Sequence, residues 1–583
     1  MISFVLFAKR KRLDQAEVAR AASSLRTQFE PLFGALGAPE IRRRGNVCLI
    51  YLHLPVKGWR PSLVQEDDET WVLAPNYPMG ASAAGREDRF SRLQPLPRLA
   101  RQLQDDPHAV LEELAPPFSL IWQDKTTGAL HLQNDGLGLA PLFEYEDGEC
   151  WAIANRPLAL RAVGVELSPV PEQWAVRMAL GWFPLDLTGF KGIAYLAPGT
   201  GIRLNETGMA RTRTDVLTNW LHAEPQAEAA WLERARSGML GLVGAAASGL
   251  EDAQVGLTGG RDSRAVASCL LALGIPFQGY VHGLDAHPDV RVARKLAQAA
   301  GIALREDSKA GVPPGNIIAG RRSIELALRW QLGSRNAHKH KTFLAGGGLL
   351  GGGRLEISGQ HGEIGRAHYA RKLDKYHPEN SDNYDGRLVG FFTSKMPPFL
   401  RSELIPHVIE VLHSACRQAD HYGVEGAARW DFFYLFERTR RWSATSHASK
   451  PGIVFAPFMN PDYIRAASAV GHDVKRGSPF HTYIVSRNWP DWTTVSYGDQ
   501  IDTADTENVQ GSEAEQSWQT IDGSRSYDTT HYWQVVGMEL IHEALSSDGF
   551  WTEVFDPTLA RSAWIHAPDE LVMLHLLSNV ILA

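Results

Sequence analysis

The sequence predicts an α/β protein in which a parallel sheet is built from alternating strands and helices. The chain has 583 residues, more than one hydrophobic core usually supports, so we expect two or three domains. Between residues 253 and 305, apolar runs of strand length alternate with runs of helical periodicity. Two consecutive glycines interrupt the first connection from strand to helix, the place where open α/β sheets bind their ligands.

The alternating region has clear ends for its helices. Gly274 and Pro276 follow the first helical run, and Gly301 follows the second, which is how helices commonly terminate. A β-α-β-α-β order of this kind is typical of a parallel sheet with helices on its faces. The expected elements are, in order, strand 253–257, helix 263–273, strand 277–281, helix 290–300 and strand 302–305.

The first strand-to-helix connection, GLTGGRDSR, has the composition of a phosphate-binding turn. Gly259 and Gly260 let an anion approach the backbone, and the free N–H groups and dipole of the following helix favour negative charge. Thr258 and Ser263 can donate hydroxyl hydrogen bonds to phosphate oxygens. Asp262 would repel a bare phosphate, so it indicates Mg²⁺ between the two. The alternative is a tight turn with Asp262 or Ser263 as a helix N-cap.

The spacing of this turn excludes two common nucleotide motifs. It has neither the G-x-x-x-x-G-K-[ST] pattern of a Walker loop nor the G-x-G-x-x-G dinucleotide pattern. The formal net charge is -7, so no general affinity for nucleic acid is expected. The four cysteines are scattered and form no C-x-x-C pair, which favours a reduced cytoplasm and argues against a zinc site.

No segment has the pattern of a membrane span. The strongly apolar residues 572–583 are too few to cross a bilayer, so we expect a packed terminal helix and no membrane partner. Residues 499–515 contain six acidic residues and no Lys or Arg. We expect a flexible insertion over 499–528.

GLTGGRDSR resembles the S-G-G-x-D-S pyrophosphate loop of the asparagine synthetase family and other ATP pyrophosphatases, with Thr258 in place of the usual serine. Farther along, SGQHGEIGRAHY is similar to T-G-E-G-A-D-E-L-F-G-G-Y of that family. This alignment matches Gly359 and places Glu363 where an aspartate binds Mg²⁺. The segment VFAPFMNPDYIRAA is similar to the stretch around R-x-P-F-L-D, with Asn460 in place of the aspartate.

The amino-terminal half resembles the glutaminase-like domain of the same family. Its segment NDGLGLAPLF is similar to R-D-x-x-G-x-x-P-L-[YF], with Asn134 in place of the arginine and Asp135 retained. FKGIAYLAPG is similar to the f-x-G-I-x-x-L-x-P-G segment that joins the two domains. The resemblance implies an Ntn-hydrolase-like α+β sandwich domain over residues 1–215, followed by an α/β PP-loop synthetase domain with a parallel sheet over 230–583.

One departure from the family bears on function. Members that take ammonia from glutamine use an amino-terminal cysteine as the nucleophile. Here the second residue is Ile2 and the first cysteine is Cys48. We therefore expect a degenerate glutaminase-like domain and an amine that comes from a source other than glutamine.

The resemblance implies ATP and Mg²⁺ as cofactors and a set of site residues. Asp262 and Glu363 are the expected metal ligands and catalytic residues, together with Lys475, or alternatively Lys450, as the lysine that stabilises the reaction intermediate. Arg261 and Arg264 are expected near the nucleotide because they flank Asp262 in the loop. The expected nucleotide-binding residues are Leu257, Thr258, Gly259, Gly260, Asp262, Ser263, Arg264 and Gly359.

These residues favour an AMP-forming ligase that adenylates a carboxylate and joins it to an amine. Relatives without the cysteine include lasso-peptide macrocyclases and β-lactam synthetases, so we expect isopeptide closure of a precursor peptide. A leader peptidase or leader-binding protein is a possible partner. Three alternatives stay open: an intermolecular ligase or β-lactam-synthetase-like cyclase acting on small carboxylates and amines, an inactive ATP-binding scaffold, and sulfur insertion into tRNA. The acidic balance argues against the last.

Overall fold

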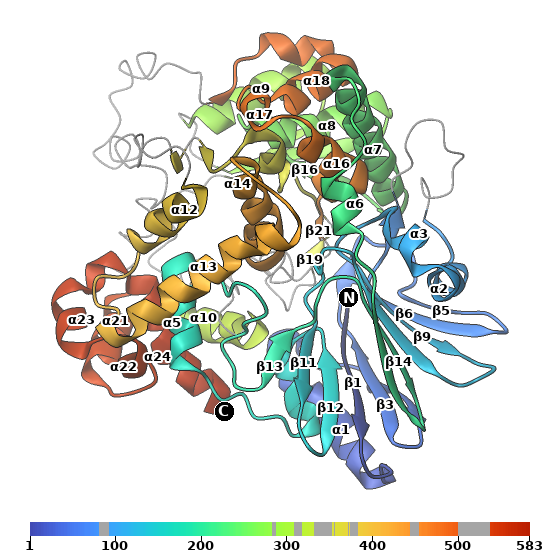
Figure 1. Cartoon of the computed structure of the whole chain (residues 1–583), viewed down its shortest axis with the longest axis vertical. Helices are drawn as coiled ribbons and strands as arrows, with labels where there is room; N and C mark the ends of the chain where they lie inside the picture. Colours follow the sequence, from blue (N-terminus) through green and yellow to red (C-terminus); the bar gives the residue numbers. More distant parts are fainter. Residues whose placement is uncertain are drawn as a thin grey trace.

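The computed structural model combines two antiparallel sheets in the amino-terminal half with one parallel sheet in the carboxyl-terminal half (Figure 1). This confirms the prediction of a mixed α/β chain with a parallel sheet. The expected insertion at 499–528 and Lys450 lie outside the described residues. The structure describes residues 1–80, 93–282, 287–307, 317–331, 353–354, 356–370, 372–373, 383–443, 454–498 and 537–582.

The first antiparallel sheet has six strands in the order β13-β11-β12-β1-β3-β2. Its central strands are buried along almost their whole length, because helices cover one face and a second sheet covers the other. The strands are β1 (Ile2–Lys9), β2 (Glu40–Arg44), β3 (Val47–His53), β11 (Phe143–Glu146), β12 (Cys150–Ala154) and β13 (Ile193–Tyr195).

The second antiparallel sheet has the order β15-β14-β10-β9-β6-β5 and packs against the first. Tyr51 of β3 and Trp71 of β6 meet between the sheets, with ring centroids 5.7 Å apart. The strands are β5 (Val64–Glu66), β6 (Thr70–Asn76), β9 (Ser119–Asp124), β10 (Leu130–Asn134), β14 (Thr200–Asn205) and β15 (Gly208–Arg213).

Helices cover the outer faces of this pair of sheets. Helix α1 (Gln15–Phe33) packs on the first sheet, and α2 (Leu96–Asp105) packs on the second. Helix α1 starts with a capping box, in which the Asp14 carboxylate accepts from the Glu17 backbone N–H at 2.6 Å. The result is a sandwich of two sheets between two helical layers.

Buried side chains hold the turn that follows strand β10. Asp135 is fully buried, and its carboxylate accepts from four backbone N–H groups, those of Phe118, Leu137, Leu139 and Ala140. The Asn134 side chain donates to Ala197 O and accepts from Thr200 N, each at 2.7 Å. These two side chains therefore fix the turn after β10 to the segment that leads into β14.

The parallel sheet has the order β18-β17-β16-β20-β21, so the strand order reverses at β16. After β16, the chain adds β17 and then β18 on one side of this strand. It later adds β20 and then β21 on the other side. In open α/β sheets, ligands bind outside the carboxyl ends of the two strands at such a reversal, and we call this place the crevice. The strands are β16 (Ala253–Gly256), β17 (Phe277–His282), β18 (Leu304–Asp307), β20 (Glu356–Ile357) and β21 (Val454–Phe455).

Helices α8 (Arg261–Ala272) and α9 (Pro288–Ala300) connect the first three parallel strands. These elements confirm the predicted order, with ends that differ by one or two residues. Above the sheet in Figure 1, α7 (Glu228–Ser248), α16 (Pro461–Ala469) and α18 (Pro479–Asn488) gather around α8, and α18 packs directly on it. This grouping brings residues near 480 to the crevice.

The terminal helix α24 (Pro568–Leu582) is packed rather than exposed. Val572, Met573 and Leu574 are fully buried, and the helix contacts α10 (Ile317–Gln331). The expectation of a packed terminal helix is confirmed. Over the described parts of the chain, no helix is both long and apolar enough to cross a membrane.

A buried cluster of charged groups joins the two halves of the chain. Leu185, in the loop after helix α5 (Pro171–Leu180), donates its N–H to Glu437 at 2.9 Å. The Leu185 carbonyl accepts from Arg440 at 3.2 Å and from Arg441 at 2.6 Å. The three charged residues lie in one π-helix, η6 (Tyr434–Ser443), and all are buried. We call Leu185, Glu437, Arg440 and Arg441 the junction cluster.

We predict that Arg441→Met destabilises the protein by about 1–3 kcal/mol, because the carbonyl of Leu185 loses a charge-assisted hydrogen bond. The measurement is the free energy of unfolding in urea. The control is Arg26→Met, which removes an exposed pair with Glu30 on α1 and should cost less than about 1 kcal/mol. Equal losses in the two variants would contradict a stabilising junction cluster.

Candidate active site at the carboxyl end of strand β16

The glycine turn leaves β16 at the crevice of the parallel sheet and is tied by its own side chains. The hydroxyls of Thr258 and Ser263 lie 3.0 Å apart, and the Gly260 N–H donates to the Thr258 hydroxyl at 3.1 Å. Leu257 is buried, and its N–H donates to Tyr280 O of β17. Gly260 is the N-cap of α8 and makes no side-chain capping bond, so the alternative of Asp262 or Ser263 as N-cap is wrong.

Two neighbouring segments contact the backbone of Gly259. Its N–H donates to the Asp289 carboxylate, in the first turn of α9, at 2.8 Å. Its carbonyl accepts from Gly498 N at 2.9 Å. A Cβ at position 259 would lie 2.9 Å from the Cα of Gly498, so this close approach requires glycine. The turn is thus enclosed on two sides by protein.

Asp262 lies in the first turn of α8, where the helix dipole stabilises a carboxylate. One carboxylate oxygen is 2.6 Å from His481 Nε2 of α18, and the other accepts from Arg366 at 2.7 Å. Burial alone would raise the pKa of Asp262, but the contact with His481 and the charges of Arg366 and Arg261 hold this pKa below its ordinary value. One oxygen of Asp262 thus accepts a hydrogen bond from Arg366, whereas the other lies in close contact with His481 Nε2 without a hydrogen bond.

Glu363 lies in the turn η4 (Gly362–Arg366), which follows β20 on the other side of the crevice. Its carboxylate accepts from the hydroxyl of Tyr434 at 2.7 Å, and the second oxygen is 3.7 Å from Arg366. The structure thus brings the two predicted metal ligands, Asp262 and Glu363, to the same guanidinium. No group of three or more His, Cys, Asp or Glu side chains suited to a metal ion occurs among the described residues.

The turn after β20 packs closely against the first turn of α8. A Cβ on Gly359 would lie 2.7 Å from the backbone nitrogen of Ser263 and 2.9 Å from the carbonyl carbon of Asp262. A Cβ on Gly362 would overlap the Asp262 carboxylate. Gly359, expected at the nucleotide site, therefore lies at the turn and allows the two sides of the crevice to meet.

Arg264 has a different position from the one expected. Its side chain is buried and donates to three carbonyls, those of Trp492, Val495 and Ser496, at 2.6 to 3.2 Å. The guanidinium therefore holds the 492–496 segment instead of facing the turn. Arg264 shares a helix face with the fully buried Ala267 and Ser268, and this spacing is the sequence signal for its buried position.

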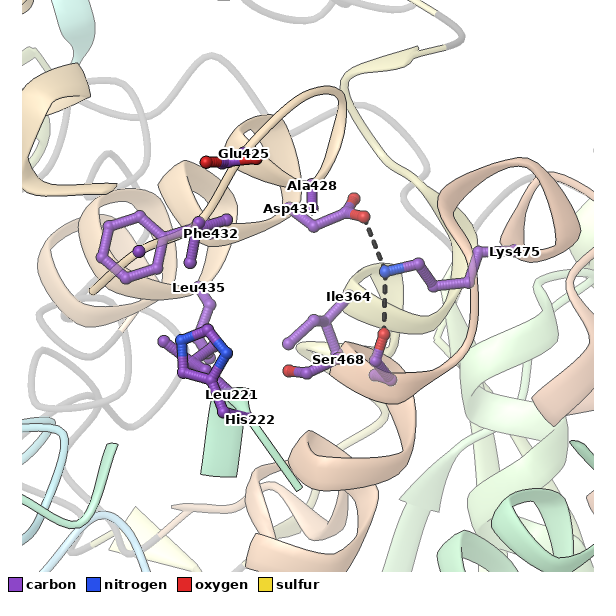
Figure 2. A pocket seen from close by; sticks show the side chains of 13 residues that line it. Leu221, His222, Ile364, Glu425, Ala428, Asp431, Phe432, Leu435, Ser468 and Lys475 are labelled. Atoms are coloured by element: carbon purple, nitrogen blue, oxygen red, sulfur yellow. Dashed lines mark hydrogen bonds and ion pairs between the residues drawn. The ribbon is translucent and has the colours of Figure 1, made fainter. Parts of the chain in front are cut away.

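Lys475 also lies apart from the glycine turn. It is 2% exposed, and its ammonium contacts Asp431 at 2.6 Å and Ala467 O at 2.8 Å. Asp431 also accepts from His472 at 2.9 Å. Figure 2 shows Lys475 reaching Asp431 at one end of a cavity. Within the described residues, its ion pair is therefore with Asp431 and not with Asp262 or Glu363.

The cavity beside Lys475 has a volume of about 200 Å³ and mostly apolar walls (Figure 2). Ile364 and Leu435 line it, and they directly follow Glu363 and Tyr434 in the sequence. The cavity therefore adjoins the elements that hold the Glu363–Tyr434 hydrogen bond. Its other polar lining groups are His222, Glu425 and Ser468.

The sequence patterns do not identify three residues of the site: Arg366, His481 and Tyr434. Arg366 follows Glu363 by three residues, and this spacing within one turn is a usable signal for a charge pair. His481 is fully buried in the first turn of α18; burial lowers its pKa, although the contact with Asp262 opposes this. No local pattern identifies His481 or Tyr434, because their positions depend on the packing of α18 and η6.

Comparison with known proteins does not define a family. No family model matches the chain, and no curated protein matches it. One similar solved structure is glutamine phosphoribosylpyrophosphate amidotransferase from B. subtilis complexed with ADP and GMP. Its identity is 13%, the match covers 52% of this chain and 65% of that chain, and the TM-score is 0.23.

A second similar structure is described as the allosteric regulatory enzyme of purine biosynthesis. Here the identity is 14%, the match covers 54% of this chain and 67% of that chain, and the TM-score is again 0.23. The chain thus spans slightly less than two thirds of the first of these proteins. Backbones that superpose so loosely carry no argument about activity.

We predict that Gly359→Ala destabilises the protein by about 1–3 kcal/mol, because its methyl group would press on the backbone of α8. Gly244→Ala is the matched control: its methyl group would meet only Leu273, at 3.6 Å, inside helix α7. That variant should be neutral or stabilising. Urea unfolding of both variants tests the contact, and a harmless Gly359→Ala would mean that the two turns do not pack as described.

We predict that Lys475→Met destabilises the protein by about 3–5 kcal/mol, because Asp431 stays buried without its cation. Adding Asp431→Leu should restore much of the loss. Burial alone would raise the pKa of Asp431, but Lys475 and His472 hold it below the ordinary value. The stability from this pair is therefore present above the unfolded pKa, about 3.9, and is lost as the pH falls through the lower folded pKa.

Urea unfolding between pH 2 and pH 7 measures this dependence. The double variant should show a weaker acid loss than the wild-type protein. A Lys475→Met variant with unchanged stability at neutral pH would contradict the structural role and favour a catalytic one.

Proposed function

We propose that this protein is an ATP-dependent, AMP-forming ligase that adenylates a substrate carboxylate and joins it to an amine. The reaction that we favour is isopeptide macrocyclisation of a precursor peptide. One observation carries the proposal: Asp262 and Glu363 meet beside a glycine turn at the reversal point of a parallel sheet. The sequence resemblance to the asparagine synthetase family supports the same chemistry.

ATP is suited to this crevice. Helix α8 is twelve residues long and begins at the turn, so its first N–H groups and its dipole favour an anion there. The hydroxyls of Thr258 and Ser263 lie at the same end of the helix. Arg261 is the first residue of α8, and its guanidinium lies over the ring of Tyr497. The turn N–H groups now bonded to Asp289 and Thr258 would have to be exchanged for phosphate oxygens.

Mg²⁺ does not fit between Asp262 and Glu363 as these residues are arranged. Both oxygens of Asp262 are in contact with His481 and Arg366, and the Arg366 guanidinium occupies the approach to Glu363. A divalent ion prefers several free oxygen ligands. The proposed reaction therefore includes no step through a metal ion held by this pair.

The chemistry asks the protein to bind a polyanion and to offset charge on the leaving group. The substrate carboxylate oxygen forms a bond to the α-phosphorus of ATP, and the bond from that phosphorus to the bridging oxygen breaks, releasing pyrophosphate. Attack of the amine on the acyl carbon then releases AMP and a proton. Arg261 and Arg366 are the cations at the turn that can offset the pyrophosphate charge.

The state of the cysteines supports an amine source other than glutamine. Burial raises the pKa of Cys48 and Cys269 to about 12 and that of Cys150 to about 11. Burial also raises the pKa of Cys416. A thiol with a raised pKa carries little of the nucleophilic thiolate at neutral pH. None of the four cysteines is thus suited to attack a glutamine amide.

The substrate acid and amine are proposed at the level of class: an Asp or Glu side chain and the amino group of a precursor peptide, with a leader peptidase or leader-binding protein as partner. The cavity beside Ile364 supports a substrate that carries a compact apolar group next to Glu363. Small carboxylate and amine substrates, as in an intermolecular ligase or a β-lactam-synthetase-like cyclase, would suit the same cavity.

A catalytically inactive ATP-binding scaffold is the second candidate. It is favoured by the engagement of Asp262 with Arg366 and His481 and by the separate ion pair of Lys475. In this case the crevice would bind nucleotide without releasing pyrophosphate. The ligase and the scaffold therefore differ in whether pyrophosphate is released.

We predict that the full chain, with ATP, Mg²⁺ and candidate precursor peptides, releases pyrophosphate and AMP in equal amounts. Asp262→Asn should reduce the rate of pyrophosphate release by about 100-fold, because Asp262 holds the Arg366 guanidinium that offsets the pyrophosphate charge. The matched control is Asp252→Asn, at an exposed carboxylate just before β16, which should keep the wild-type rate. ATP binding without pyrophosphate release for any substrate would favour the scaffold.

A further inference from the structure

Arg366 connects the two carboxylates of the candidate site. Its Nη2 atom is 2.7 Å from one oxygen of Asp262 and 3.7 Å from one oxygen of Glu363. The remaining oxygens contact His481 and the Tyr434 hydroxyl. The Arg366 side chain is only 19% exposed, so this cluster is largely shielded from water.

Two carboxylates this close require a cation between them, because like charges repel strongly away from solvent. A guanidinium is suited to this task, since it is planar, always charged and weakly hydrated. In asparagine-synthetase-like sites the expected cation is a divalent metal ion. Here a side chain of the protein already lies in that position.

The backbone fixes Arg366 at this place. The turn η4 is flanked by His361 at φ 78° and Ala367 at φ 48°, both in the left-handed region although neither is glycine. Such conformations are unfavourable for residues other than glycine and persist only where the surroundings impose them. Gly362 also packs on the Asp262 carboxylate. Arg366 therefore lies in a turn that the protein holds in place.

One nitrogen of Arg366 is left without a partner. Its Nε is buried and has no hydrogen-bond acceptor within the described residues. A guanidinium carries five N–H donors, and those on Nη2 face the carboxylates. An unpaired buried donor is costly, so this N–H is suited to an anion oxygen that enters the crevice.

We propose that Arg366 is a built-in cation that replaces a divalent metal ion between Asp262 and Glu363, and that the nucleotide-free protein consequently holds no metal there. Arg366 then also presents donors to an anion at the turn. That this anion is a triphosphate rests on the proposed function, whereas the exclusion of metal does not.

The test is a titration of the full, nucleotide-free chain with Mn²⁺ alone. Binding is measured as the decrease of the free-ion signal of Mn²⁺ in electron paramagnetic resonance. Mn²⁺ serves as probe because it accepts the same oxygen ligands as Mg²⁺. The wild-type protein should show no site that depends on Asp262. The Arg366→Gln variant should gain one site that binds Mn²⁺ at least tenfold more tightly than the wild-type protein does. Adding Asp262→Asn to this variant should remove the site.

Arg366→Lys is the matched control, because it keeps a cation and should exclude Mn²⁺ as the wild type does. A wild-type protein that binds one Mn²⁺, with this binding lost in Asp262→Asn, would overturn the proposal even if the Arg366 variants fail to fold. A folded Arg366→Gln variant that gains no site would overturn it as well. Because the assay contains no nucleotide, its outcome is separate from that of the pyrophosphate assay.

Discussion

The contact of Asp262 with Arg366 and His481 is the interaction on which the candidate site depends. A carboxylate with little access to water is stable only when it is paired, and here the partners come from η4 and α18. The contact thus ties the first turn of α8 to η4, about one hundred residues farther along the chain, and to α18, about two hundred residues farther along. It joins the segments on the two sides of the strand-order reversal at β16.

The amino-terminal half contributes structural contacts to this arrangement. Its turn at Asn134 and Asp135 is used in backbone hydrogen bonds, and burial raises the pKa of its Cys48 thiol. The junction cluster ties the loop at Leu185 to η6, the π-helix that also carries Tyr434. Packing between the two halves therefore reaches Glu363 through a short chain of direct contacts.

Much of the parallel sheet could be predicted from the sequence, because strand and helix periodicity and terminal glycines are local signals. The pairing of Asp262 with Glu363 was also within reach, but only through the resemblance of the segment around Glu363 to the asparagine synthetase family, because no strand before Glu363 was predicted. The directions of the side chains at the site could not be predicted from the sequence. Arg264 lies beside Asp262 in the sequence but faces three carbonyls, and Lys475 pairs with Asp431, because both directions are decided by segments distant in the sequence. His481 gave no local sign for the same reason.

Charge balance at the crevice constrains how nucleotide and Arg366 could act together. Asp262 and Glu363 carry two negative charges, and Asp289, which accepts from the Gly259 N–H, adds a third. Arg366 and Arg261 carry two positive charges, so these groups keep a net negative charge before an anion arrives. A triphosphate that pulled Arg366 away would leave both carboxylates without their cation in a shielded place, which is costly. The five N–H donors of a guanidinium offer another arrangement, in which Nη2 stays with Asp262 while the unpaired Nε meets a phosphate oxygen. Arg366 would then join the phosphates to the carboxylates, and lysine could replace its charge but not this bridging geometry.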